Sequence, residues 1–152
     1  MTSLPSTVFA TGHVGLNVSD LERSRDFYGA VFGLAVQYES SDESKRYAFL
    51  GDDERLVLTL WQQSDGGFDA GRPGLHHLSF EVPDIDDVRA AEERVRAAGG
   101  RLHHGGIVPH AEGRSSGGIF FEDPDGIRLE IYTGSGAEGH APTGAAPTCG
   151  FF

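Results

Sequence analysis

The sequence contains one short pattern twice, and this internal repeat limits the folds that the chain can adopt. Segments 11–18 and 75–82 each contain a histidine, His13 or His77, followed by apolar residues at the first, third and fifth positions after it. Alternating apolar residues predict a β-strand with one buried face. A helix start signal follows each strand. The repeat therefore indicates two copies of one structural unit, in which His13 and His77 are equivalent residues.

The chain length fits one domain built from both copies. The 152 residues suit a single compact domain, and a unit of roughly 60 residues would be only marginally stable alone. We therefore expect the two units to share one hydrophobic core. The pattern predicts a first module at 8–62, a linker at 63–74, a second module at 75–133 and an extended tail at 134–152.

Both modules show the same order of secondary-structure signals. Ser19 begins a segment with capping-box spacing, and Asp84 with Asp87 does so in the second module. The predicted elements are a strand at 9–18, a helix ending at Gly33 and strands at 34–39, 46–50 and 55–62, then a strand at 75–82, a helix at 85–98 and strands at 101–104, 117–122 and 126–132. The sequence thus predicts an α+β protein made of two paired βαβββ modules.

Composition excludes several classes of partner. A net charge of -11 with only 12 Lys and Arg residues argues against nucleic-acid binding, which needs clustered basic residues. Cys149 is the one cysteine, so an intrachain disulfide or a cysteine-based zinc site is excluded. The sequence has no signal-peptide pattern at its start and no apolar run of the roughly 18 residues that a membrane span needs. We expect a cytoplasmic protein with a small-molecule ligand and no membrane partner.

Alternate side chains of a strand share a face. In four of the predicted strands one face is apolar, and the opposite face carries a mixture of polar and aromatic residues. These mixed faces carry His13 and Asn17, Thr59 and Trp61, His77 and Ser79, and Arg128, Glu130 and Tyr132. A curled sheet with the helices outside would turn them into a concave cleft. Two imidazoles and one carboxylate with open positions form the ligand set of mononuclear non-haem Fe(II) sites, which Mn(II), Zn(II), Co(II) or Ni(II) can also occupy. The sequence therefore predicts a metal site at His13, His77 and Glu130.

The repeat also indicates how many ligands the protein supplies. Segment 49–61 aligns with 120–132 without a gap, which places Thr59 at the position of Glu130. Threonine is a poor metal ligand. We therefore expect three protein ligands and open positions for a substrate.

These residues and their order resemble the vicinal oxygen chelate superfamily, which includes glyoxalase I, type I extradiol dioxygenases, fosfomycin-resistance transferases, methylmalonyl-CoA epimerase and metal-free bleomycin-binding proteins. The resemblance covers about residues 8–133. It rests on His13 followed by Val18-Ser19-Asp20, Phe27-Tyr28 within the helix, Gly33-Leu34 at its end, His77, and the Asp-Pro-Asp-Gly turn before Glu130. It implies paired βαβββ modules, a divalent metal at the three ligands, and substrates that chelate through two adjacent oxygens.

Departures from the resembled enzymes narrow the expected chemistry. Glyoxalase I typically carries Glu, Gln or His where this chain has Thr59. Ring-cleaving dioxygenases use three protein ligands, as here, with a Tyr where this chain has Phe120 and a histidine acid/base, for which His110 is the candidate. We therefore expect a dioxygenase-like enzyme with Fe(II) or Mn(II), in which His110 is catalytic. A glyoxalase-like lyase or isomerase and a non-catalytic drug- or metabolite-binding protein are the alternatives.

The remaining residues of the mixed faces are candidates for substrate contacts. Trp61 and Tyr132 occupy equivalent positions and could stack on a ligand, and Arg128 could hold an anionic group. The other candidates are Asn17, Thr59, Ser79 and Phe120. Members of the resembled superfamily often pair modules between subunits, so we expect a homodimer. His13 would then meet His77 either of its own chain or of a second one.

Overall fold

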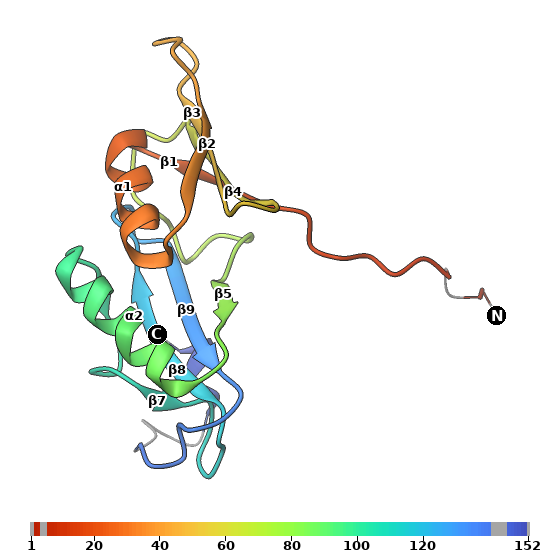
Figure 1. The fold of residues 1–152 in the computed structure, drawn as a ribbon, viewed down its shortest axis with the longest axis vertical. Helices are drawn as coiled ribbons and strands as arrows, with labels where there is room; N and C mark the ends of the chain where they lie inside the picture. Colours follow the sequence, from red (N-terminus) through yellow and green to blue (C-terminus); the bar gives the residue numbers. More distant parts are fainter. Residues whose placement is uncertain (1, 4–5, 141–145, 152) are drawn as a thin grey trace.

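The computed structural model describes residues 2–3, 6–140 and 146–151, within which the chain forms two β-sheets and two α-helices (Figure 1). The first sheet has the order β1 (Val14–Val18), β4 (Leu56–Gln62), β3 (Tyr47–Gly51) and β2 (Ala35–Glu39). The second has the order β5 (Leu78–Glu81), β9 (Arg128–Thr133), β8 (Gly117–Glu122) and β6 (Arg101–Leu102), and β7 (Val108–Pro109) also pairs with β8. The helices are α1 (Leu21–Phe32) and α2 (Ile85–Ala97). Residues 141–145 and 152 of the predicted tail lie outside the described residues.

The two sheets repeat one topology. β1 lies parallel to β4, and β5 lies parallel to β9, whereas the other pairs are antiparallel. The register pairs Gly15 with Thr59 in the first sheet and Ser79 with Glu130 in the second. The predicted α+β class with mixed sheets is therefore confirmed, and Thr59 and Glu130 occupy matching positions.

Each helix begins at an aspartate that caps its first turn. The Asp20 carboxylate accepts a hydrogen bond from the backbone N–H of Arg23, and Asp84 forms a capping box with Asp87. The predicted start at Ser19 is wrong by one residue, because the Ser19 side chain bonds across to the second module. α1 ends at Gly33, whose φ of 68° is a left-handed conformation that glycine adopts without strain.

One hydrophobic core joins the two modules. Phe32 of α1 contacts Phe80 of β5 with ring centroids 4.5 Å apart, and Phe27 lies 6.4 Å from Phe121 of β8. The Arg94 Nε–H of α2 donates to the backbone oxygen of Val31 at 2.9 Å. Figure 1 shows both helices on the same side of the two sheets, with the first module above the second. Burial of both helices in a common core fits the expectation that neither module is stable alone.

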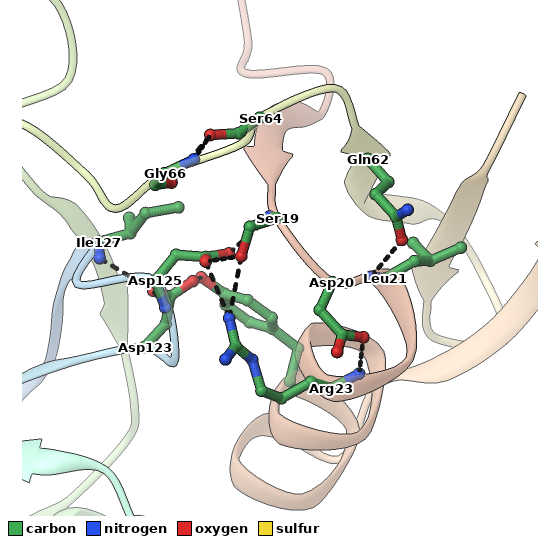
Figure 2. Close-up of polar contacts among 11 residues, drawn as sticks. Ser19, Asp20, Leu21, Arg23, Gln62, Ser64, Gly66, Asp123, Asp125 and Ile127 are labelled. Atoms are coloured by element: carbon green, nitrogen blue, oxygen red, sulfur yellow. Dashed lines mark hydrogen bonds and ion pairs between the residues drawn. The ribbon is translucent and has the colours of Figure 1, made fainter.

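A polar cluster also ties the start of α1 to the β8–β9 turn (Figure 2). The buried Asp125 carboxylate accepts hydrogen bonds from the backbone and side chain of Ser19 and pairs with Arg23 at 2.9 Å. The Tyr28 hydroxyl donates to Asp123 at 2.8 Å. Burial raises the pKa of Asp123 and, together with the charge of Asp123, raises that of Tyr28. These bonds fix the orientation of one module relative to the other.

Several predicted strands are longer than the observed ones. β1 begins at Val14 and β5 at Leu78, because their pairing with β4 and β9 begins at those residues. The strand predicted at 101–104 ends at Leu102, and β7 was not predicted. Within the described part of the chain, no helix has the length and apolar character needed to cross a membrane.

Candidate metal and substrate site

Glu130 is a carboxylate buried on the face of β9 that points away from the helices. Its residue is 3% exposed, and the Ser79 hydroxyl on the neighbouring strand donates to its Oε1 at 2.5 Å. A buried carboxylate is costly unless hydrogen bonds, a counter-charge or a metal ion compensates it. Glu130 therefore has the setting of a ligand or a catalytic carboxylate.

His110 contacts the other oxygen of Glu130. Its Nε2 lies 3.1 Å from Oε2 of Glu130, and its Nδ1 lies 2.9 Å from the Ser116 hydroxyl. Since a carboxylate can only accept, Nε2 carries the proton in this arrangement, and Ser116 can donate to a neutral Nδ1. The ring packs against Tyr132 and Phe120 at centroid distances of 5.1 and 6.3 Å. The structure thus brings the predicted acid/base next to a predicted metal ligand, while Ser116 was not predicted.

His77 directly precedes β5 of the second sheet. Burial lowers the pKa of His77, and the negative charge of Glu130 partly opposes this effect. The neutral imidazole that burial favours is the form that binds metals. His77 Nδ1 lies 2.8 Å from Nδ1 of His76, so one of these two nitrogens carries a proton.

The first module has no carboxylate at the matching place. Thr59 is buried, and its Oγ1 accepts a hydrogen bond from the indole N–H of Trp61 at 2.9 Å. Asn17 accepts a hydrogen bond from the backbone of Gln63 at the end of β4. The side chains of Thr59 and Asn17 therefore both form hydrogen bonds within the first module.

An aromatic cluster surrounds Trp61 and was not predicted as a group. Tyr47 stacks on Trp61 at 4.9 Å, Phe49 lies edge-on to it, and Tyr38 packs on both Tyr47 and Phe49. Tyr38 remains 51% exposed. Tyr47 and Phe49 alternate with the core residues Ala48 and Leu50 along β3, so the strand-face argument applied to Trp61 could have found these two. The cluster offers a partly exposed apolar surface for a ligand or a protein partner.

His13, the third predicted ligand, is an exposed residue just before β1. In the parts of the chain that the structure describes, no three His, Cys, Asp or Glu side chains form a group that could hold a metal ion. Two predicted ligands belong to the second module and one to the first. Whether the three bind one metal ion therefore stays a prediction.

Three other predicted substrate residues lie around Glu130. The Tyr132 hydroxyl donates to Glu81 at 3.4 Å, and Phe120 is fully buried with the His104 ring edge-on to it. Arg128 lies near enough to His77 to lower its pKa electrostatically. These residues surround Glu130, but their contact with a substrate stays a prediction.

Part of the C-terminal segment also lies near this site. Residues 148–150 form a short 3-10 helix, in which Thr148 is 2% exposed. Burial and the charge of Glu130 raise the pKa of the Cys149 thiol. Cys149, considered in the sequence only as a free thiol in a tail, therefore lies within electrostatic range of Glu130.

Comparison with known proteins identifies the family. The sequence profile of the glyoxalase/bleomycin resistance protein/dioxygenase superfamily matches residues 10–131. This chain belongs to that superfamily. The predicted resemblance to the vicinal oxygen chelate superfamily is thereby confirmed.

Relatives within the superfamily include lyases and dioxygenases. A lactoylglutathione lyase of Haemophilus influenzae is 34% identical over 123 residues, which cover 78% of this chain and 88% of that enzyme. A catechol-2,3-dioxygenase of Bacillus subtilis is 27% identical over 124 residues, but this chain spans only 40% of its length. These relatives support an enzyme whose substrate is a small molecule.

Solved structures show the same fold. A glyoxylase/bleomycin resistance protein/dioxygenase domain from Frankia sp. EAN1pec matches with a TM-score of 0.70 and 27% identity, covering 84% of this chain and 99% of that one. The fosfomycin resistance protein FosX of Listeria monocytogenes, in a complex with Mn(II) and 1S,2S-dihydroxypropylphosphonic acid, matches with a TM-score of 0.65 and 19% identity. That match covers 85% of this chain and 95% of the FosX chain.

Proposed function

We propose that this superfamily member is a divalent-metal-dependent enzyme that acts on a small substrate chelating through two adjacent oxygens, with dioxygenase-like chemistry. The observation that carries the proposal is the difference between two matched positions. Glu130 is a buried carboxylate within electrostatic range of His77, whereas Thr59 is hydrogen-bonded by Trp61. A three-ligand shell leaves positions open for substrate and dioxygen.

The proposed ligands are His77 and Glu130 of one chain and His13 of a second copy. The donor chemistry of the first two fits a divalent metal, because one is a buried carboxylate and the other an imidazole whose pKa burial lowers, within electrostatic range of that carboxylate. One imidazole more completes the ligand set typical of Fe(II) and Mn(II), which are favoured over Zn(II), Ni(II) and Co(II). When bound, such a metal would supply Lewis-acid activation and a template for substrate and oxygen.

The chain's own residues would orient the substrate and move a proton. His110 can pass a proton to or from a group near Glu130, because its imidazole lies within hydrogen-bond reach of that carboxylate and is fixed from behind by Ser116. Tyr132 and the aromatic cluster around Trp61 provide apolar surfaces that exclude water from an aromatic substrate.

Metal analysis and oxygen uptake test this proposal. Protein purified without chelators is assayed for metal, loaded with Fe(II) under anaerobic conditions and tested for oxygen consumption with a panel of catechols. We expect bound Fe or Mn and uptake with at least one catechol, and loss of both in His77→Ala. His140→Ala serves as the matched control, because His140 belongs to the C-terminal segment and lines a pocket with Arg89 and Glu92 of α2. Wild-type protein without metal affinity, or equal affinity in His77→Ala, would contradict the proposal.

A glyoxalase-like lyase is the second candidate, and one observation favours it. The Haemophilus influenzae lactoylglutathione lyase is 34% identical and matches over 88% of its length. His110 or Glu130 would then have to carry out the proton transfer, because Thr59 occupies the position where glyoxalase I typically carries Glu, Gln or His. Turnover of a hemithioacetal with Ni(II) or Zn(II), without oxygen consumption, would select this function over the dioxygenase.

A further inference from the structure

The C-terminal segment 146–151 is anchored to the strand that leads into His110. The Thr148 backbone N–H donates to the His110 carbonyl at 2.9 Å, and its hydroxyl donates to the Pro109 carbonyl at the same distance. Thr148 is 2% exposed, so both bonds lie away from water. Loss of a donor at such a site leaves a buried carbonyl unsatisfied.

β7, the strand that receives these bonds, is weakly held by its own sheet. It has only two residues, Val108 and Pro109, which pair with Gly118 and Gly117 of β8. Pro109 has no N–H and can give the ladder no donor. Beyond β7, the His110 N–H continues the ladder by donating to the Ser116 carbonyl at 2.9 Å, and the Thr148 bonds to the Pro109 and His110 carbonyls add to this hydrogen bonding.

The position of β7 decides where the His110 imidazole lies. His110 follows Pro109 directly, and its ring reaches Glu130 Oε2 at 3.1 Å and Ser116 Oγ at 2.9 Å. A displacement of the backbone by an ångström would lengthen both contacts beyond hydrogen-bond range. Any residue that fixes the Pro109 and His110 carbonyls therefore also fixes the imidazole on Glu130.

A second attachment sets the segment beside the same site. The His104 Nε2–H donates to the Thr148 carbonyl at 3.3 Å, and the His104 ring lies edge-on to Phe120, which packs against His110. The effect of Glu130 on the adjacent Cys149 thiol agrees with this placement. The segment thus bonds to both histidines whose rings contact Phe120.

From these contacts we propose that Thr148 is a positioning residue of the candidate site: by bonding to the backbone of Pro109 and His110, it holds the His110 imidazole on Glu130. The role of that imidazole in metal-dependent chemistry rests on the proposed function. The placement of the imidazole by Thr148 does not. The two can therefore fail separately.

The test compares Thr148→Val with Thr148→Ser, which keeps the hydroxyl. Thr133→Val is the control, because Thr133 is also buried and its hydroxyl donates to a backbone carbonyl, that of Pro83. Three readouts are used: NMR signals of the His110 ring nitrogens in metal-free protein, the rate at which a disulfide reagent modifies Cys149, and the Kd for Mn(II). Cys149 is the one cysteine of the chain, so the reaction reports on this segment alone.

We expect Thr148→Val to change the His110 signals toward those of a solvent-exposed histidine. Modification of Cys149 should accelerate about tenfold, the factor that corresponds to losing one buried hydrogen bond. The Kd for Mn(II) should rise about tenfold, as for loss of an outer partner of a ligand. Thr148→Ser and Thr133→Val should match wild type in all three readouts.

Unchanged His110 signals in a folded Thr148→Val variant would overturn the proposal, even if Cys149 becomes reactive. If Thr148→Val does not fold, wild type and Thr148→Ser decide. Modification of Cys149 in native wild type as fast as in the urea-unfolded chain would overturn the proposal. Modification at least tenfold slower than in the unfolded chain, in wild type and in a folded Thr148→Ser variant, would support it. Absence of Mn(II) binding in wild type would contradict the proposed function, while the histidine and thiol readouts would still decide the role of Thr148.

Discussion

Glu130 and Thr59 occupy matching positions in the two sheets but have opposite chemistry. Each pairs with a residue of the edge strand: Glu130 with Ser79 on β5, and Thr59 with Gly15 on β1. The Ser79 hydroxyl donates a hydrogen bond to one oxygen of the Glu130 carboxylate, whereas the Thr59 hydroxyl oxygen accepts one from the indole N–H of Trp61. A buried carboxylate needs such partners, and His110 supplies the second one, so its presence in one module alone points to a role in binding or catalysis.

Substitution of Glu130 by its amide separates this role from packing. Glu130→Gln keeps the size of the side chain and removes the charge. We expect the Kd for Mn(II), measured by calorimetry, to rise by more than about 100-fold, since loss of an outer partner alone typically costs about 10- to 100-fold. Glu122→Gln, which removes a carboxylate paired with His103, is the control. Equal Mn(II) affinity in Glu130→Gln and wild type would contradict the ligand assignment.

The environment of Tyr28 predicts how the free energy of unfolding changes at alkaline pH. Burial and the neighbouring Asp123 raise the pKa of Tyr28 well above its ordinary value of 10. A raised pKa contributes stability that is complete below pH 10 and is lost as the pH rises toward the folded-state value. Urea unfolding should therefore show a free energy that falls above pH 10, by up to about 1.4 kcal/mol per pH unit for this group.

The variant Tyr28→Phe tests this dependence. It should lose about 1.5–3 kcal/mol at pH 7, because the hydrogen bond to a charged acceptor is removed. The fall in stability above pH 10 should become shallower, since this tyrosine no longer titrates. Tyr38→Phe removes the hydroxyl of a tyrosine that is 51% exposed and serves as the control. Parallel pH profiles for Tyr28→Phe and wild type would show that this residue does not set the alkaline limit.

At the level of elements, β8 depends on two glycines for its close contacts. A Cβ on Gly118 would overlap the carbonyl oxygen of Ile131 on β9, and one on Gly117 would overlap that of Val108 on β7. In both cases the obstacle is backbone, which cannot rotate away as a flexible side chain can. These glycines let β7 and β9 lie against β8 on either side, with His110 and Glu130 on neighbouring segments.

Gly118→Ala should therefore be severely destabilising. We expect a loss of about 3 kcal/mol or more in the free energy of unfolding by urea, the upper range for overpacking at a buried site. Gly134→Ala is the matched control, because a Cβ there meets nothing within 4 Å, and its effect should stay within about 0.5 kcal/mol. A loss below about 1 kcal/mol in Gly118→Ala would show that β8 and β9 can separate at little cost.

The elements show which structural features local sequence signals determine. Strand alternation and helix caps predicted α1, α2 and the order of the strands, since those signals are local. The starts of β1 and β5 were predicted too early, because a strand ends where its partner does, which alternation cannot reveal. β7 has two residues, too few for any periodicity. The contact of His110 with Glu130 depends on β7, so the sequence suggested the residue but not its partner.

At the scale of the whole molecule, the shared core controls where the mixed faces point. α1 packs on both modules, and Ser19 and Tyr28 bond to the β8–β9 turn. The two helices therefore contact each other on one side of the two sheets, each against the sheet of its own module. His13 on the first module remains exposed, and the described residues form no three-donor group. Pairing of modules depends on this tertiary arrangement, which a repeated sequence pattern does not specify.

Exchange of ligands between two copies predicts complementation between two inactive variants. If His13 of one copy binds with His77 and Glu130 of another, His13→Ala and His77→Ala should each lose Mn(II) binding. Co-refolding them in equal amounts should restore about a quarter of the wild-type Mn(II) capacity, because about half of the dimers are mixed and each has one intact site. Calorimetry on the mixture measures this capacity, and mixing His77→Ala with Glu130→Gln, which alter the same half-site, is the control. No recovery in the first mixture would show that His13 does not complete the site of a second copy.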